Sequence, residues 1–257
     1  MRCKALAFLG IIAALGMAAL SGADLAHAQA VVVRSTGPSA ATFPKGKRLP
    51  ANMQVVLKSG DVVTVLDKAG TRVLKGAGSF TLDNAVNRDR SAAALLARSL
   101  SNPASVRAGA VRGAGDTSGE NVMPVSIWLA DTTEGGNVCV PRGSDLYLWR
   151  TESKARSFTW LTESAGGEMV RMQWPPRTVG IAWPKTMLAP QEGRVYRIYD
   201  ETTPDKAAEF RIVMLEPEAV PADAASLGTL LLDNGCKAQF DWLAATLAEP
   251  EIQEQHP

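Results

Sequence analysis

Short runs of β-branched and apolar residues, separated by turns that contain glycine, make up the chain from residue 31 to residue 82. Such runs predict β-strands, because β-branched side chains suit an extended backbone and glycine supplies the positive φ of tight turns. The predicted strands span residues 31–33, 54–58, 61–66, 71–75 and 79–82. We expect consecutive hairpins that form a small β domain over residues 31–82.

A second series of short apolar runs fills residues 122–217. Apolar and polar residues alternate in several of them, as in Val170, Met172 and Trp174, which places one face of each strand in a core. The predicted strands span residues 123–129, 137–140, 145–149, 157–162, 168–174, 178–183, 194–199 and 209–215. Their regular spacing predicts an antiparallel β-sandwich, which is immunoglobulin-like in architecture.

The segments around the second series have a different pattern. Residues 83–100 favour a helix that Asp83 caps. Residues 104–121 are rich in Gly, Ala and Ser, which predicts a flexible linker, so residues 83–121 are expected to be a helix followed by a linker. After Pro217 the apolar period becomes helical. We expect a helical hairpin in residues 218–257, with Asp223 as an N-cap and Gly235 between the helices. The fold class is therefore mainly β, with a C-terminal helical hairpin.

The first 30 residues resemble a cleaved export signal. Arg2 and Lys4 precede an apolar run over residues 5–20, and small residues follow as Ala26-His27-Ala28-Gln29-Ala30. We expect cleavage near Ala28 or Ala30 and a periplasmic product. The alternative is an N-terminal membrane anchor, but the run is shorter than the roughly 20 residues of a spanning helix. No second run reaches that length, so the product is expected not to span a membrane.

Two cysteines remain once Cys3 leaves with the signal. Cys139 and Cys236 both lie in apolar patterns, and an even number of cysteines in an exported chain predicts a disulfide. The alternative is a pair of unpaired buried thiols.

Histidine is nearly absent from this chain. Its two histidines are His27, in the signal, and His256, next to the C-terminus. Most zinc sites and the Ser-His-Asp and Cys-His sites need an interior imidazole, so these chemistries are disfavoured. No catalytic, metal or cofactor site is predicted.

Charge is distributed unevenly along the chain. Residues 31–120 carry 13 Lys/Arg and 6 Asp/Glu, whereas residues 121–257 carry 12 and 19. The two halves are expected either to attract each other or to leave the basic half free for an anionic envelope surface. Lys45, Lys47 and Arg48 form the densest basic group and are the candidate patch for such a surface. An exported protein is not expected to bind nucleic acid.

Aromatic residues and carboxylates supply the remaining candidates. Tyr147 and Trp149 share one strand face, and they are the expected exposed pair on which a ligand such as a glycan would stack. The alternative is that the tryptophans fill the core. Glu163 and Glu168 flank the Gly166-Gly167 turn, and a carboxylate pair is the minimum for glycoside cleavage.

The first series of strands also resembles a known family. The segment from Leu57 to Leu74, with its Ser59-Gly60-Asp61 turn and its second turn at Gly70, followed by Gly76-Ala77-Gly78, is similar to the FecR-type periplasmic domain. The resemblance implies a small β domain in the periplasm. It covers about 50 residues, and the best-known members carry a membrane span and a cytoplasmic anti-sigma segment where this chain has an export signal. Transmembrane signalling is therefore not implied.

Together these observations predict a soluble, exported, non-enzymatic binding protein of the cell envelope, whose partner is an envelope protein or a glycan. One alternative is an envelope glycan hydrolase that uses carboxylates. Another is a structural envelope component held by its basic N-terminal half.

Overall fold

A computed structural model of the chain describes residues 30–50, 53–68, 70–82, 94–97, 100, 126–150 and 155–248. The predicted fold class is confirmed: the protein is mainly β, with several antiparallel sheets and a C-terminal helical pair. Residues 94–97 are helical within the helix expected over residues 83–100. The expected linker over residues 104–121 and the signal residues before Ala30 lie outside the described residues.

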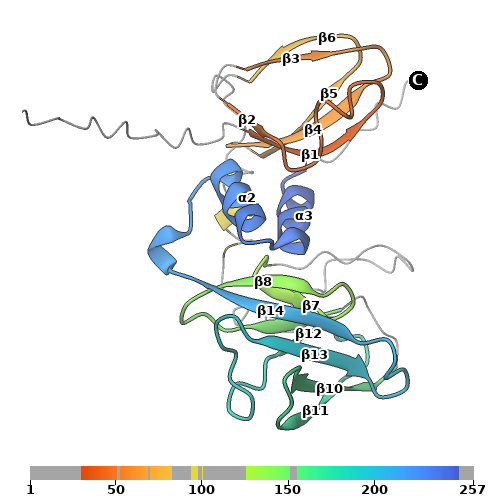
Figure 1. Cartoon of the computed structure of the whole chain (residues 1–257), viewed down its shortest axis with the longest axis vertical. Coiled ribbons are helices and arrows are strands. Elements are labelled where there is room, and N and C mark those ends of the chain that lie inside the picture. The colour runs from red at the N-terminus through yellow and green to blue at the C-terminus, as the bar shows by residue number, and fades with distance from the viewer. Residues whose placement is uncertain are drawn as a thin grey trace, which may run out of the picture.

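The N-terminal unit consists of two small sheets that enclose one apolar core (Figure 1). One sheet has four strands in the order β2-β1-β4-β5, and the other pairs β3 with β6. Buried aliphatic side chains such as Val32, Val55 and Val63 meet between them. The strands are β1 (Ala30–Thr36), β2 (Arg48–Leu49), β3 (Gln54–Leu57), β4 (Val62–Asp67), β5 (Gly70–Lys75) and β6 (Gly78–Thr81).

The expectation of consecutive hairpins in this unit is wrong. Of the turns between the predicted strands, only the one between β4 and β5 joins paired strands, whereas β3 pairs with β6 and β4 pairs with β1. The turn before β4 is held instead by Asp61, which is 1% exposed and accepts hydrogen bonds from the backbone N–H groups of Ser39 (2.8 Å) and Lys58 (2.6 Å). This carboxylate ties the turn to the loop after β1, so the chain crosses from one sheet to the other.

Two further features of Asp61 follow from its surroundings. A Cβ atom at Gly37 would lie 2.6 Å from Asp61 Oδ1, so only glycine fits beside the carboxylate. Burial raises the pKa of Asp61, but the hydrogen bonds from Ser39 and Lys58 outweigh burial and hold the pKa below its ordinary value.

The second unit is a β-sandwich with the expected number of strands. Its sheets have the orders β11-β10-β13-β14-β8 and β12-β9-β7, and they share one core that includes Leu148, Trp174 and Phe210. The strands are β7 (Leu129–Asp131), β8 (Gly136–Pro141), β9 (Tyr147–Trp149), β10 (Ser157–Glu163), β11 (Met169–Trp174), β12 (Gly180–Ala182), β13 (Val195–Asp200) and β14 (Ala208–Leu215).

Two details of the sandwich differ from the expectation. Residues 126–128 of the strand expected over residues 123–129 are not in a strand, which starts at Leu129 instead (β7, Leu129–Asp131), and residues 123–125 lie outside the described residues. Two strand pairs, β7 with β9 and β8 with β14, are parallel. The consecutive strands β7 and β8 belong to different sheets, so they form no hairpin with each other. β7 pairs instead with β9 and β8 with β14, and in both cases the intervening chain is long enough to return in the parallel direction.

The C-terminal helices form as the pattern predicts. After a short 3-10 helix, η2 (Pro217–Ala219), helix α2 spans Ala224–Asp233 and helix α3 spans Lys237–Thr246. The Asp223 side chain accepts a hydrogen bond from Ser226 N and caps α2, and Gly235 has φ +72° between the helices. No helix in the described part of the chain has the length and apolar character needed to cross a membrane.

The helical pair lies between the two β units (Figure 1). Its apolar side chains, among them Leu231 and Phe240, pack in one cluster with Val31 and Leu66 of the N-terminal sheet and with Trp128 of the segment before β7. The two β units are therefore joined by a continuous apolar core.

A covalent bond and a buried amide attach α3 to the sandwich. Cys139 on β8 and Cys236 before α3 form the predicted disulfide, with Cα atoms 5.9 Å apart. Beside it, Gln239 Oε1 accepts from Cys139 N (2.6 Å), and Gln239 Nε2 donates to the carbonyls of Ile127 (2.6 Å) and Cys139 (2.8 Å). Because each donor and acceptor of this buried amide is used, it fixes the register of α3 against the strand.

Candidate functional site

The candidate basic patch lies against the acidic half of the chain. Lys45 Nζ is 2.6 Å from Asp241 Oδ1 of α3, and Arg48 pairs with Asp233 of α2. Lys47 donates to the Thr42 carbonyl (2.7 Å). Two of these three cations are thus neutralised by the helical pair, which accords with attraction between the halves. Both ion pairs are about half-exposed and contribute little to stability.

The aromatic residues of β9 do not form the expected exposed pair. Trp149 is 7% exposed and its ring meets that of Trp242 on α3 edge to face, with centroids 5.3 Å apart, while Tyr147 is half-buried. The sequence alternation separates two faces of this strand but does not reveal that α3 covers one of them. A ligand platform on Tyr147 and Trp149 would therefore need α3 to move.

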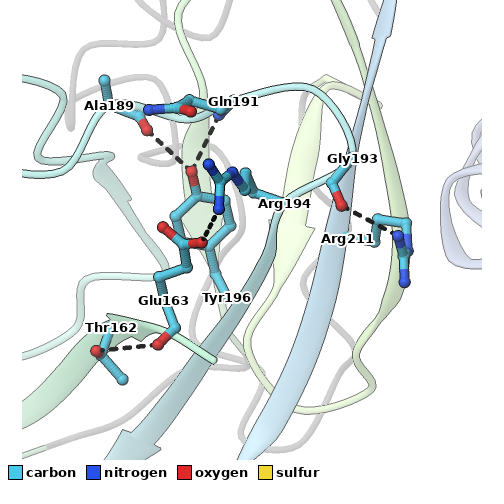
Figure 2. Close-up of polar contacts among 8 residues, drawn as sticks. All are labelled: Thr162, Glu163, Ala189, Gln191, Gly193, Arg194, Tyr196 and Arg211. Carbon is cyan, nitrogen blue, oxygen red and sulfur yellow. Dashed lines mark hydrogen bonds and ion pairs between the residues drawn. The ribbon is translucent and has the colours of Figure 1, made fainter. Parts of the chain in front are cut away.

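The carboxylates at the Gly166-Gly167 turn are also engaged or solvated. Figure 2 shows Glu163 with its side chain against Arg194, and the ion pair measures 2.8 Å. Glu168, on the other side of the turn, is exposed. The Glu163 carboxylate is therefore already engaged in an ion pair.

Tyr196 beside this pair has a structural role. Its hydroxyl donates to the Ala189 carbonyl (2.9 Å) and accepts from Gln191 N (3.0 Å), as Figure 2 shows. Burial raises the pKa of this hydroxyl, so it stays protonated at neutral pH. A tyrosine at the start of a strand that bonds the backbone a few residues upstream is typical of immunoglobulin-like sandwiches.

A row of aromatic and arginine side chains occupies the face of the five-stranded sheet that points away from the sandwich core. Strand register places Trp160 of β10 between Arg171 of β11 and Tyr199 of β13. We define the outer sheet face by these and their neighbours: Phe158, Trp160, Met169, Arg171, Arg197 and Tyr199. Three adjacent strands contribute to it.

The outer sheet face is held in place by its own contacts. The Arg171 guanidinium lies 3.8 Å from the centre of the Phe158 ring and donates to both oxygens of Glu201 (3.0 and 2.8 Å). The pair raises the pKa of Arg171 and lowers that of Glu201. A bidentate pair that stacks on an aromatic ring is rigid, so these side chains are pre-organised.

The outer sheet face is open to solvent. Met169 is 53% exposed, and Arg171 and Arg197 are exposed. Arg197 lies over the Tyr199 ring at 5.4 Å, and Arg211 on the neighbouring strand β14 donates to the Gly193 carbonyl (3.0 Å; Figure 2). Among the described residues, neither Arg197 nor Arg211 has an ion-pair partner.

Sequence reasoning did not identify this surface. The alternation showed that Phe158 and Trp160 share a face, but not that the face is solvated. A usable signal was present, because the Gly166-Gly167 hairpin sets Trp160 opposite Arg171, and a charged cross-strand neighbour marks the solvent side.

The described part of the chain contains no group of three or more His, Cys, Asp or Glu side chains that could hold a metal ion. Comparison with protein-family models gives no match, and no curated protein is significantly similar to the chain.

Proposed function

We propose that this chain is an exported, soluble, non-enzymatic binding protein of the cell envelope, and that its outer sheet face contacts a protein partner. The observation that carries the proposal is the solvent-facing set of side chains across β10, β11 and β13, in which Met169, Arg171 and Arg197 are exposed and the rings of Phe158, Trp160 and Tyr199 are half-buried.

The composition of the face favours a protein over a glycan. Trp, Tyr, Met and Arg are enriched in protein interfaces, and Trp, Tyr and Arg carry most of the binding free energy. Arg197 on the face and Arg211 beside it have no ion-pair partner among the described residues, and these two cations favour a partner that presents carboxylates around an apolar centre.

Three observations support export. The first 30 residues have the three-part pattern of a signal, the Cys139–Cys236 disulfide suits an oxidising compartment, and residues 57–80 resemble a FecR-type periplasmic domain.

The binding proposal is tested by photo-cross-linking in envelope preparations, followed by affinity measurement with the partner that is identified. Trp160→Ala is expected to weaken binding by ~2 kcal/mol or more, which is roughly 30-fold. Arg197→Glu is expected to slow association, most strongly at low salt. Val56→Ala is the matched control, since Val56 is 60% exposed on β3 and far along the chain from the face.

The possible results separate the alternatives. A partner that binds the Trp160→Ala and wild-type proteins equally well would overturn the assignment of the face. A glycan array that gives a wild-type signal, lost in Trp160→Ala, would replace the protein partner by a glycan. Circular dichroism of each variant establishes that the fold is retained.

A further inference from the structure

The turn between α2 and α3 (Figure 1) contains an asparagine followed by a glycine. Asn234 is the C-cap of α2, and Gly235 follows it with φ +72°. An asparagine in this position is chemically labile, because glycine has no side chain to hinder attack by its backbone nitrogen on the side-chain amide. Every other asparagine of the chain precedes a residue with a side chain. Both residues of the pair are partly exposed, so water reaches them.

The native backbone of this turn opposes the reaction. Ring closure joins Gly235 N to Asn234 Cγ, so the Asn234 ψ angle must bring that nitrogen to the side of the Cβ atom. The observed ψ of 2° turns the nitrogen away from Cβ. Rotation would break two backbone hydrogen bonds, which run from Gly235 N to the Leu232 carbonyl (3.0 Å) and from Cys236 N to the Leu231 carbonyl (2.7 Å). The turn must therefore open before the ring can close.

Side-chain contacts hold the asparagine in the same unreactive position. Asn234 Nδ2 donates to the Leu230 carbonyl (2.9 Å), which holds the amide against α2. From the sandwich, Asn137 Nδ2 on β8 donates to the Asn234 carbonyl (2.7 Å). A further restraint is covalent, because Cys236 is bonded to Cys139. Since the restraints come from both α2 and the sandwich, the stability of the joint between them sets how often the turn opens.

We propose that Asn234 is a deamidation site whose reaction the native turn between α2 and α3 suppresses. When the turn opens, Gly235 N forms a bond to Asn234 Cγ, and the bond from that carbon to Nδ2 breaks. The Nδ2 nitrogen leaves as ammonia with the amide proton of Gly235. Water then opens the succinimide ring at one of its two carbonyl carbons, which leaves aspartate or isoaspartate at position 234. The reaction needs no oxidant, metal or enzyme.

The products fit the turn less well than asparagine does. A carboxylate at position 234 has no proton to donate to the Leu230 carbonyl, and it adds negative charge at the C-terminal end of α2, beside Asp233. Isoaspartate also lengthens the backbone by a methylene just before Cys236, whose position the disulfide fixes. Deamidation therefore weakens the attachment of the helical pair, and it does so only in molecules whose turn has opened.

Peptide mapping of the purified full chain, incubated at mildly alkaline pH with and without unfolding concentrations of guanidinium chloride, tests the proposal. Mass spectrometry with an isoaspartate assay follows conversion at Asn234, and Asn137, which precedes a valine, is the internal reference. Conversion at Asn234 is expected to be at least about tenfold faster in the unfolded than in the native protein. Equal rates would overturn the protection by the turn, and no conversion in the unfolded protein would overturn the site.

Two variants test the restraint and its consequence, with circular dichroism to establish that each is folded. Asn137→Ala removes the donor to the Asn234 carbonyl, so it should raise the native rate by about fivefold and leave the unfolded rate unchanged. A wild-type native rate would overturn the restraint assigned to this contact. Asn234→Asp reproduces one product and is expected to unfold at least about 2 °C below the wild type. A midpoint equal to that of the wild type would overturn the predicted weakening.

Discussion

Two sheet faces of this protein point away from the core of their own unit and carry apolar side chains, but other elements cover only one of them. On the N-terminal sheet, Val31 and Leu66 are fully buried under α2 and α3. On the five-stranded sheet, Trp160 is half-buried and Met169 is 53% exposed. The first face is part of the folded interior, and the second remains available.

The side chains explain this difference. Val31 and Leu66 are aliphatic and gain only from removal from water, so the fold supplies the helices to cover them. The outer sheet face combines rings with guanidinium groups that stack on them, as Arg171 does on Phe158. Such a surface is stable in water and still offers a large apolar area to a partner. Aromatic and arginine residues on a sheet face therefore point to binding, whereas aliphatic residues point to internal packing.

The largest expected effect separates the two faces directly. Phe240 is fully buried in the core shared by the units, so Phe240→Ala should lower the free energy of unfolding by about 3 to 5 kcal/mol. Trp160→Ala is expected to cost less, because the ring is only half-buried. Urea unfolding of both variants measures the difference. Equal losses would mean that the outer sheet face is as important for stability as the shared core.

Removal of the disulfide is expected to give the second-largest loss in the free energy of unfolding. Cys139 and Cys236 are 97 residues apart in sequence, and closing so long a loop restricts the unfolded chain. The Cys139→Ser, Cys236→Ser double variant should lose about 2 to 5 kcal/mol. Guanidinium unfolding with and without reductant checks this, since reductant should destabilise the wild type and leave the variant unchanged. Wild-type stability that does not depend on reductant would contradict the prediction.

Acid should destabilise the N-terminal unit through Asp61. Because the folded-state pKa of Asp61 lies below its ordinary value of 3.8, its contribution to stability is fully present above that pH. The contribution is lost as the pH falls through 3.8 toward the folded pKa. Asp61→Asn should be less stable at pH 7 and show a shallower decline of stability below pH 3.8. Thermal melts across this pH range measure both, and a parallel decline in the two proteins would exclude Asp61 as the cause.

The smallest expected effect concerns the charges between the units. Lys45 and Arg48 pair with Asp241 and Asp233 at half-exposed positions, so each pair contributes about 0 to 1 kcal/mol. A Lys45→Ala, Arg48→Ala variant should stay compact in small-angle scattering at low and at high salt, because the apolar core holds the units together. Expansion of this variant would show that charge, and not the apolar core, joins them.

Local pattern predicted most of the elements, and particular residues show why. The Asp223 cap, Gly235 and the alternation of Val170, Met172 and Trp174 depend on near neighbours in sequence, and each is confirmed. Partners that lie far apart in sequence were not predictable in this way. β3 pairs with β6 across two intervening strands, Asp61 bonds to a loop 22 residues away, and the burial of Trp149 depends on α3.

For this protein, the sequence alone determined the fold class, most of the strand positions, the cap and turn of the C-terminal helices and the disulfide partners, because the period of apolar residues and the chemistry of turns and caps act over a few residues. Only the tertiary structure shows which faces of the sheets are exposed to solvent. The helical pair between the two units, the burial of Trp149 and the exposure of the outer sheet face each depend on which surfaces meet. Which surfaces meet depends on contacts between segments that are far apart in sequence. Those contacts form only when the whole chain packs together.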